Sequence, residues 1–577
     1  MTKQLKEKIA EAAGRKKADL VLKNAVVVNV FTETLEKADV AICGDTIVGV
    51  GSYEGEEEVD LEGKYLCPGF LDGHIHLESS MLLPGEFEKA VLPHGTTGVF
   101  TDPHEIANVA GTRGIDFMME QTKGLTMDVF FMLPSCVPAS PMEEAGAVLT
   151  ARELKPYYGC ERVAGLAEVM DAFGTVAARD DVLEKLEDAR LNGKRLDGHA
   201  PGLSGNLLNA YVTAGIGSDH ECSTPEEGIE KISRGQWVMI REGTAARNLE
   251  ALLPLCKAPF YTRCMFVTDD RHPEGLRSDG HMDAIIRKAV NLGVNPIQAI
   301  RMATLHTAQY FGKLQLGAVA PGYHADLVVL SDLEKVKVTD VYKNGKKVTS
   351  QVFQSSIPVK EIEKKYPEIL HSFHMETVTP QDLALKREGE KLRVIELIPG
   401  EILTRENVVP YTVNPGYAKG VDISKDIIKV AVLERHHHTG HIGIGFLKGY
   451  GLKEGAVATS VAHDTHNLIV TGVNDEDMAL AANTVREQEG GLALVKNGEI
   501  LGTLPLPVGG LMSLWGAQKA EDTLEELKRT AAALGCKAGI DPFMTLAFIS
   551  LPVIPCLRLN GLGLIDVQKQ AVEDCIF

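Results

Sequence analysis

Between residues 65 and 312, eight short apolar runs alternate with stretches of helical pattern. This rhythm is typical of βα units around a parallel sheet, and eight units predict a (β/α)8 TIM-like barrel of the α/β class. The predicted strands are Tyr65–Phe70, Gly98–Thr101, Asp128–Leu133, Val163–Ala167, Arg195–Gly198, Ala214–Ser218, Trp237–Ile240 and Met265–Thr268. The predicted helices include Asp180–Leu191, Thr224–Ser233, Thr244–Leu255, Met282–Asn291 and Pro296–Phe311, the last with Asn295 as its N-cap.

A small β-rich unit flanks the barrel on both sides in the sequence. Runs rich in Val and Ile at Asp19–Val30 and Ala38–Val50 precede the barrel, and similar runs follow it around the hairpin signal Asn344-Gly345. We expect the two sets to pair into one composite β-sandwich. The remaining chain mixes strand-like runs with helical ones, which predicts an α+β C-terminal domain. The predicted divisions are 1–64 and 313–355 for the β-sandwich, 65–312 for the barrel and 356–577 for the C-terminal domain.

The C-terminal region offers its own strand and helix predictions. They are the strands Ile427–Leu433 and Leu492–Val495, the helices Asp475–Gln488 and Ala520–Leu534, and a solvated linker or helix at Lys360–Lys365.

The charge and the cysteines exclude several classes of partner. The formal net charge of −20 at pH 7 argues against nucleic acid, because binding to phosphates needs concentrated Lys and Arg. The first 17 residues lack the apolar core of a secretory signal, and no stretch is long and apolar enough to span a membrane. The ten cysteines form no C-x-x-C pair. We therefore expect a cytoplasmic protein with a small-molecule substrate and no membrane partner.

Side chains that can bind metal follow the predicted barrel strands. In such barrels the chemistry lies at the carboxyl ends of the strands. The first strand leads into His74-Ile75-His76, whose two imidazoles project from one side of an extended chain. Imidazole combined with carboxylate suits zinc, iron or manganese. The other predicted ligands are Glu168 after strand four, His199 after strand five, His220 after strand six and Asp269 after strand eight.

Each predicted ligand also has a structural interpretation. His199 could be a turn histidine, and Glu168 could be a carboxylate at a helix N-terminus. Asp270 competes with Asp269, which we prefer because it directly follows the apolar strand. A satisfied core or helix position is the favoured interpretation for His94, His104, His281 and His306, of which His104 is the closest alternative ligand.

Several segments resemble a known superfamily. Pro68–His76, the later histidines with the aspartate, and Gly317–Val329 together resemble the amidohydrolase superfamily. Within it, the chain is similar to the bacterial adenine deaminases. The motifs that carry this similarity are His76-Leu77-Glu78-Ser79-Ser80-Met81, Thr101-Asp102-Pro103-His104-Glu105-Ile106-Ala107-Asn108, Ser218-Asp219-His220-Glu221 and Ala462-His463-Asp464-Thr465-His466-Asn467.

The resemblance implies a binuclear metal centre. Related cyclic-amide hydrolases bridge their two metals with a carboxylated lysine at the end of strand four, where this chain has Glu168. The resemblance thus implies that Glu168 bridges two divalent ions, with Mn²⁺ preferred and Fe²⁺ or Zn²⁺ compatible. In this hypothesis one ion is held by His74 and His76, the other by His199 and His220, and Asp269 completes the set.

The expected reaction follows from such a centre. A metal-bound water has its pKa lowered from about 16 towards about 7, and the resulting hydroxide would attack C6 of adenine, giving hypoxanthine and ammonia. We expect Asp269 to shuttle the proton and Glu221, next to His220, to protonate the purine ring. The alternative role of Glu221 is a helix-start carboxylate before Thr224.

Other functions stay open at this point. A cyclic amide hydrolase or an N-acetyl deacetylase would use the same hydroxide, and a non-enzymatic barrel scaffold would be expected to have lost the ligands. Serine hydrolase, P-loop and dinucleotide motifs are absent from the sequence. The histidines at His436–His438, His463 and His466 receive no firm role, although one hypothesis places His463 or His466 over the barrel mouth. We expect a homo-oligomer, with a symmetric dimer as the default.

Overall fold

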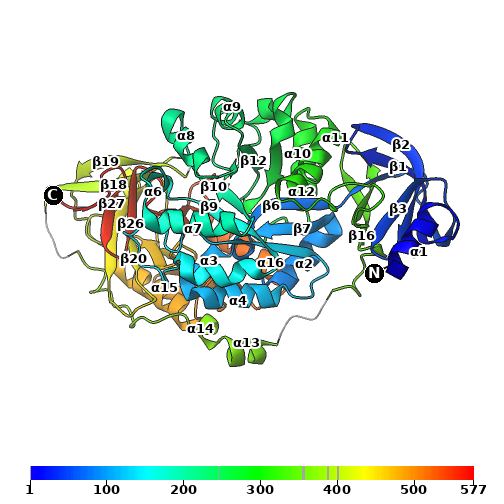
Figure 1. Ribbon diagram of the computed structural model, residues 1–577. Coiled ribbons are helices and arrows are strands. Elements are labelled where there is room, and N and C mark those ends of the chain that lie inside the picture. The colour runs from blue at the N-terminus through cyan, green and yellow to red at the C-terminus, as the bar shows by residue number, and fades with distance from the viewer. Residues whose placement is uncertain (1, 245, 354–357, 386–388, 399–401) are drawn as a thin grey trace.

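The computed structural model describes residues 2–244, 246–353, 358–385, 389–398 and 402–577. A parallel barrel lies in the middle of the molecule, with a small sheet on one side and the C-terminal sheets on the other (Figure 1). The α/β class and the barrel predicted from the sequence are confirmed. The domain divisions stay predictions, and the boundary at 355–356 lies outside the described residues.

Two hydrogen-bonded sheets form the barrel wall, in the orders β10-β9-β8-β7-β6-β14 and β11-β12-β13. The ring closes on one side because β14 pairs with β6, and on the other because the Gly217 amide donates to the Leu196 carbonyl at 2.9 Å. The strands are β6 (Phe70–His76), β7 (Thr96–Thr101), β8 (Asp128–Leu133), β9 (Val163–Val169), β10 (Arg195–Gly198), β11 (Ser218–Asp219), β12 (Trp237–Arg241), β13 (Cys264–Val267) and β14 (Asp269–Asp270).

Two predicted strands are displaced. The run predicted as Tyr65–Phe70 divides at Gly69, so that β5 (Tyr65–Pro68) joins the small sheet and β6 continues into the barrel with the two histidines inside it. The strand predicted at Ala214–Ser218 is wrong over most of its length, because helix α8 (Gly205–Thr213) ends in a turn there. Apolar residues at a helix end and in a strand look alike in so short a window.

The predicted barrel helices are partly confirmed. Asn295 caps its helix, accepting a hydrogen bond on Oδ1 from the Ile297 amide at 2.9 Å. The single helix predicted over 296–311 is wrong, because the chain breaks after α11 (Pro296–Met302) and resumes in α12 (Leu305–Tyr310). The barrel helices are α2 (Pro84–Val91), α3 (His104–Ala110), α4 (Thr112–Gln121), α5 (Ala151–Leu154), α6 (Ala172–Val176), α7 (Asp180–Leu191), α8, α9 (Pro225–Ser233), α10 (Met282–Asn291), α11 and α12.

The helix predicted at Thr244–Leu255 is wrong for the described residues. They form turns that lead into the 3-10 helix η4 (Leu253–Cys256). Asn248 explains the difference, because its side chain accepts from the Arg241 amide at 2.7 Å and donates to the Cys222 carbonyl at 3.0 Å. Such bonds from a side chain to distant backbone compete with helix formation.

The segments before and after the barrel pair in one sheet, called the small sheet here, as the predicted pairing requires, while the β-sandwich stays a prediction. Strand β15 runs antiparallel to β5, with Val329 opposite Leu66. Asn344 and Gly345 have φ values of 51° and 75°, which a two-residue hairpin turn of type I′ requires. The sheet contains β1 (Ala18–Asn29), β2 (Thr34–Cys43), β3 (Thr46–Gly51), β4 (Gly55–Asp60), β5, β15 (Leu327–Asp332), β16 (Lys337–Lys343) and β17 (Lys346–Lys347), and α1 (Thr2–Ala12) packs on it.

The C-terminal region is α+β, as predicted. Its large sheet has the order β19-β18-β21-β20-β23-β22-β24-β25, and a smaller sheet contains β26, β27 and β28. The strands are β18 (Lys391–Leu397), β19 (Thr404–Pro410), β20 (Ile427–Leu433), β21 (Ile442–Lys448), β22 (Ala456–Thr459), β23 (Leu468–Gly472), β24 (Gly491–Lys496), β25 (Glu499–Pro505), β26 (Leu557–Asn560), β27 (Gly563–Asp566) and β28 (Ala571–Glu573). The helices are α13 (Val359–Lys365), α14 (Pro367–Leu370), α15 (Asp475–Glu487), α16 (Ala517–Ala533) and α17 (Met544–Ala547).

The C-terminal region packs against the barrel at the end where the strands finish. Asn467 donates from Nδ2 to the Glu144 carbonyl at 2.9 Å, and His437 donates from Nε2 to the Ala145 carbonyl at 2.8 Å, so both hold the loop after β8. A continuous buried cluster of apolar side chains joins the two parts. Among the described residues, no helix has both the length and the apolar character needed to cross a bilayer.

Candidate metal centre and substrate pocket

The six predicted ligands converge at the carboxyl ends of the barrel strands. Their side chains come from five strands or from the residue directly after a strand, and only one of them is more than slightly exposed. The rings of His74 and His220 stack with their centroids 4.3 Å apart. The converging residues are His74 and His76 in β6, Glu168 in β9, His199 after β10, His220 after β11 and Asp269 in β14.

Glu168 lies between two pairs of histidines. Its Oε1 is 3.2 Å from His76 Nε2 and 3.8 Å from His74 Nε2. Its Oε2 is 3.0 Å from His199 Nδ1 and 3.3 Å from His220 Nε2. Burial alone would raise the pKa of this carboxyl, but the surrounding histidines hold the pKa well below its usual range. Each oxygen of the carboxylate therefore faces a different pair of imidazoles.

The hydrogen bond on the far side of His76 determines its tautomer. His76 Nδ1 lies 3.1 Å from the Asp102 carbonyl oxygen, which can only accept a hydrogen bond. In the neutral ring, Nδ1 therefore carries the proton, and the lone pair of Nε2 points at the carboxylates of Glu168 and Asp269. A lone pair facing two carboxylates is unfavourable unless a cation lies between them, and this arrangement of a metal-binding histidine is common in proteins.

The other donors also fit a metal. His199 Nδ1 and His220 Nε2 lie 3.1 Å apart, both beside the same carboxylate oxygen. His74 Nε2 and Glu168 Oε1 are buried and make no hydrogen bond. Buried polar atoms without partners are rare in folded proteins, and metal coordination would satisfy these. The donor set of imidazoles and carboxylates thus fits a divalent metal cofactor.

Asp269, rather than Asp270, faces the centre. Its Oδ1 is 3.1 Å from His76 Nε2 and 3.5 Å from His74 Nε2. Its backbone lies in the left-handed region with φ of 63°, which aspartate tolerates better than most residues. Asp270 instead accepts a hydrogen bond from Ser79 Oγ at 2.5 Å. The geometry agrees with the sequence-based preference for Asp269.

Arg241 is a residue of this site that the strand-end pattern did not lead us to predict. Its Nη1 lies 2.5 Å from Glu221 Oε1 and 2.5 Å from Asp269 Oδ2, and its Nη2 lies 2.9 Å from Glu221 Oε2. Burial would raise the pKa of Asp269, but Arg241 and the neighbouring histidines hold it well below its usual range. Arg241 is the last residue of β12, so its place at a strand end was a usable signal.

A buried ion pair supports the backbone around His199 and His220. Asp219 accepts from the amide that follows His199 at 2.7 Å and from the amide that follows His220 at 3.0 Å. Lys231 of α9 lies 2.9 Å from the same carboxylate, and both side chains are fully buried. Burial would raise the pKa of Asp219, but Lys231 contributes to lowering it to about 2. The pair therefore orders the half of the centre that comes from two separate strands.

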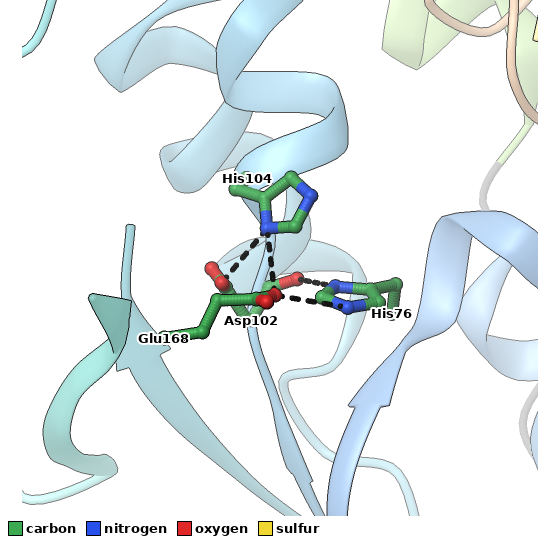
Figure 2. Close-up of side chains that lie close together, drawn as sticks. All are labelled: His76, Asp102, His104 and Glu168. Carbon is green, nitrogen blue, oxygen red and sulfur yellow. Dashed lines mark hydrogen bonds and ion pairs between the residues drawn. The ribbon is translucent and has the colours of Figure 1, made fainter. Parts of the chain in front are cut away.

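His104 also lies in the centre, although a core position was the favoured interpretation. Figure 2 shows its ring above Asp102 and Glu168, with His76 beside these carboxylates. His104 Nδ1 is 2.9 Å from Asp102 Oδ2 and 3.3 Å from Glu168 Oε1. The residue begins α3 shortly after β7, so its strand-end position outweighs its helical context.

The three other histidines that received a structural interpretation from the sequence lie outside the cluster. His306 donates from Nδ1 to the Cys264 carbonyl at 2.9 Å, and His281 Nδ1 pairs with Thr96 Oγ1 at 3.0 Å. His94 donates from Nε2 to a backbone carbonyl at 3.0 Å. These contacts agree with the interpretation of His94 and His306 as satisfied structural histidines, whereas His281 Nε2 is buried without a hydrogen-bond partner, 3.3 Å from Asp72 Oδ2.

Side chains of the C-terminal region close the pocket above the centre. His463 reaches the barrel, with Nδ1 2.9 Å from Glu105 Oε1, and His466 lies behind it against the same carboxylate. This placement agrees with the hypothesis that His463 lies over the barrel mouth. His436 instead donates from Nε2 to the Thr465 carbonyl at 2.7 Å and has a structural role. The C-terminal residues that line the pocket are Ile402, His463, Asp464, Phe548, Leu551 and Ile554.

Two family models match separate parts of the chain. Residues 65–348 match the model of the amidohydrolase family, and residues 401–571 match that of the adenine deaminase C-terminal domain. The chain is 46% identical to "Adenine deaminase 2" of Carboxydothermus hydrogenoformans, with 99% of each chain covered. It is 44% identical to "Adenine deaminase" of Bacillus velezensis and 45% identical to that of Dehalococcoides mccartyi, with 98% of each chain covered in both cases. The chain therefore belongs to the adenine deaminase family of the amidohydrolases.

Proposed function

We propose that the protein deaminates adenine, hydrolysing it to hypoxanthine and ammonia. The observation that carries this proposal is the Glu168-centred cluster at the barrel mouth, in a chain that is similar over almost its whole length to proteins named adenine deaminase. A glutamate, instead of the lysine of the cyclic-amide hydrolases, stands at the end of strand four. The enzyme is thus a metal-dependent hydrolase of the C6–N bond of adenine.

The centre would hold two divalent ions per chain, preferably Mn²⁺, with Fe²⁺ and Zn²⁺ as alternatives. This is supported by Glu168, whose two oxygens face different histidine pairs. His74 and His76 would bind one ion, His199 and His220 the other, with Glu168 bridging. Asp269 would complete the first set, and His104 is an additional donor near the Oε1 side of Glu168.

Two carboxylates of the chain would carry the protons. When bound, the metal ions supply a water whose pKa is lowered towards about 7, so that it can attack C6 at neutral pH. Asp269 would accept a proton from this water and return one to the amino group, which leaves as ammonia. The ring nitrogen beside C6 must gain a proton as C6 becomes tetrahedral, and Glu221 would deliver it.

Arg241 defines how Glu221 can act. Its guanidinium donates to both oxygens of Glu221 and so fixes the orientation of this carboxyl group. From this position Glu221 would pass a proton to the ring nitrogen, and the second proton of the attacking water would replace it once ammonia has left. Because Nη1 of Arg241 also contacts Asp269, the same guanidinium would keep the two proton carriers at a fixed separation.

The competing functions are less well supported. A cyclic amide hydrolase or N-acetyl deacetylase would share the metal centre, but the full-length similarity is to proteins named adenine deaminase. A non-enzymatic scaffold has no reason to keep six converging ligands with a buried ion pair beneath them.

The test is turnover of adenine by metal-free protein reconstituted with Mn²⁺, Fe²⁺ or Zn²⁺. Ammonia release and the ultraviolet change of the purine would be followed together, with hydantoin and dihydroorotate as control substrates. We expect turnover of adenine alone, restored by two ions per chain. Turnover of a control substrate with none of adenine would reject the proposal.

Three further predictions from the sequence stand beside this proposal. They are the cytoplasmic location, the homodimer and the four-part domain division. Light scattering after gel filtration and limited proteolysis would test the last two.

A further inference from the structure

A second carboxylate at the barrel mouth binds two histidines of the C-terminal region. Glu105, in α3, lies 2.9 Å from His463 Nδ1 through its Oε1 and contacts His466 Nε2 through its Oε2. All three side chains are almost fully buried. Burial would raise the pKa of Glu105, but the two histidines contribute to holding it well below its usual range.

The backbone decides what His466 can do. The Ala462 amide donates to His466 Nδ1 at 3.1 Å, so Nδ1 is the acceptor and Nε2 carries the proton in the neutral ring. Burial lowers the pKa of His466 to about 4, which favours this neutral form. In this form His466 turns its Nε2 proton towards Glu105 Oε2, which it contacts. With His466 protonated on Nε2 this contact needs no metal ion, although the three side chains lie close enough together to hold one.

The far nitrogen of His463 is left for a ligand. Since Nδ1 faces Glu105, Nε2 points away from it, is buried and has no hydrogen-bond partner. The nearest acid is Asp270, whose Oδ2 is 3.8 Å away, beyond hydrogen-bond distance. Phe548 stacks on the ring with centroids 4.6 Å apart, which fixes its plane. Burial would lower the pKa of His463, but Glu105 and Asp270 raise it to about 9, so that Nε2 carries a proton.

We propose that His463 is a substrate-contacting residue, whose Nε2 donates a hydrogen bond to a ring nitrogen of the bound purine. Glu105, held by His466, is the positioning residue that orients the imidazole. A purine offers acceptor nitrogens on its edge and apolar faces, which match the Nε2 donor and the walls formed by Phe548, Leu551 and Ile554. The inference rests on the proposed function and deepens it, because the C-terminal region then supplies a substrate contact that the barrel alone does not provide.

Two substitutions of His463 separate the pocket contact from the bond to Glu105. In His463→Asn, the amide can replace Nδ1 but does not reach the position of Nε2. In His463→Gln, the longer amide reaches that position. We expect the asparagine variant to lose about 10- to 100-fold in kcat/KM for adenine, the range for a hydrogen bond from a charged group, and the glutamine variant to recover most of this loss.

Metal content, thermal midpoint and a surface control are measured with the kinetics. His438→Asn, an exposed histidine of the same region that pairs with Glu376, should leave kcat/KM unchanged. Equal kcat/KM in wild type and His463→Asn would overturn the inference. So would equal losses in both His463 variants, or the loss of one metal ion, which would make the cluster a metal site. Failure of the wild type to deaminate adenine would instead reject the proposed function itself.

The role of Glu105 is tested by a double-mutant cycle. If Glu105 acts through His463, Glu105→Gln combined with His463→Asn should be no slower than His463→Asn alone. Glu105→Gln alone should reduce kcat/KM by less than His463→Asn, since the imidazole stays in the pocket. Additive losses in the double variant would show that Glu105 acts independently and would overturn its positioning role.

Discussion

The barrel mouth contains two carboxylates that each bind several histidines, yet the two clusters have opposite chemistry. Around Glu168, the neutral His76 ring donates a hydrogen bond from Nδ1 to a backbone carbonyl and turns the lone pair of Nε2 towards the carboxylate. Around Glu105, the His466 ring accepts a hydrogen bond from a backbone amide on Nδ1 and turns the N–H of Nε2 towards the carboxylate. With neutral rings, the first arrangement fits a cation at its centre, whereas in the second an N–H already faces the carboxylate.

This contrast shows that the residues facing a carboxylate do not by themselves define a metal site. Both clusters consist of histidine and glutamate at close distances. What separates them is the group on the far side of each ring, because a carbonyl or an amide there fixes which nitrogen carries the proton.

The largest expected effect separates the two glutamates. Glu168→Gln removes the charge between the histidine pairs and should release metal and lower kcat by at least about 10³-fold, since metal and activated water are lost together. Glu105→Gln, the matched substitution, should retain the full metal content. Metal analysis of both purified variants checks this. Equal metal content in the two variants would contradict the distinction between the clusters.

A buried lysine should be the next most sensitive position. Lys231→Met leaves the Asp219 carboxylate buried and unpaired beneath His199 and His220, which should cost about 3–5 kcal/mol of stability. We expect a lower thermal midpoint together with weaker binding of one of two ions, measured by differential scanning fluorimetry and metal titration.

Lys343→Met is the control for that variant. Lys343 is also buried, 2.7 Å from Asp128 and 2.7 Å from Asp326, but it lies in the small sheet, away from the centre. It should lower the thermal midpoint without changing metal affinity. If both variants weaken metal binding equally, the Asp219 pair has no special connection to the Glu168 cluster.

Arg241 supplies the Glu168 cluster with a permanent positive charge. Arg241→Lys keeps the charge but loses the two parallel bonds to Glu221, so kcat should fall by about 10- to 100-fold while metal content stays constant. Steady-state kinetics with adenine on fully metal-loaded protein measures this. A wild-type kcat would mean that the paired bonds from Arg241 to Glu221 are dispensable for proton transfer.

The smallest expected effect is a pH dependence of stability. The pKa of Asp219 is about 2 in the folded protein and about 3.9 when unfolded, so its contribution is present above about pH 4 and is lost as the pH falls towards 2. The contribution is about 2 kcal/mol. In metal-free protein, the thermal midpoint of wild type should therefore fall more between pH 5 and pH 3 than that of Asp219→Asn. Parallel curves would contradict the assignment.

Much of the barrel and of the centre could be predicted because strand ends are visible in sequence. His74, His76 and Glu168 each stand at the end of an apolar run, and the structure brings them together. The barrel also follows from the alternation of apolar runs with helical stretches, because the number of predicted strands does not depend on where each strand begins and ends.

The missed residues have a common physical reason. Arg241 and His104 occupy strand-end positions, but an arginine is not a metal ligand and a histidine at a helix start has an ordinary structural alternative. The contact of His463 with Glu105 joins residues that lie 358 positions apart in the sequence (463 − 105), and no local sequence pattern encodes a contact of that separation. The direction of each imidazole proton depends on backbone groups that only the folded chain provides.

The pairing of β5 with β15 has a consequence for the order of folding. Leu66 finds its partner Val329 only after the whole barrel has been synthesised, so the edge of the small sheet stays open while the barrel strands assemble. Long-range pairing of this kind slows folding and leaves a strand edge exposed to other chains during synthesis. The small sheet can therefore be completed only after all the barrel strands have been synthesised.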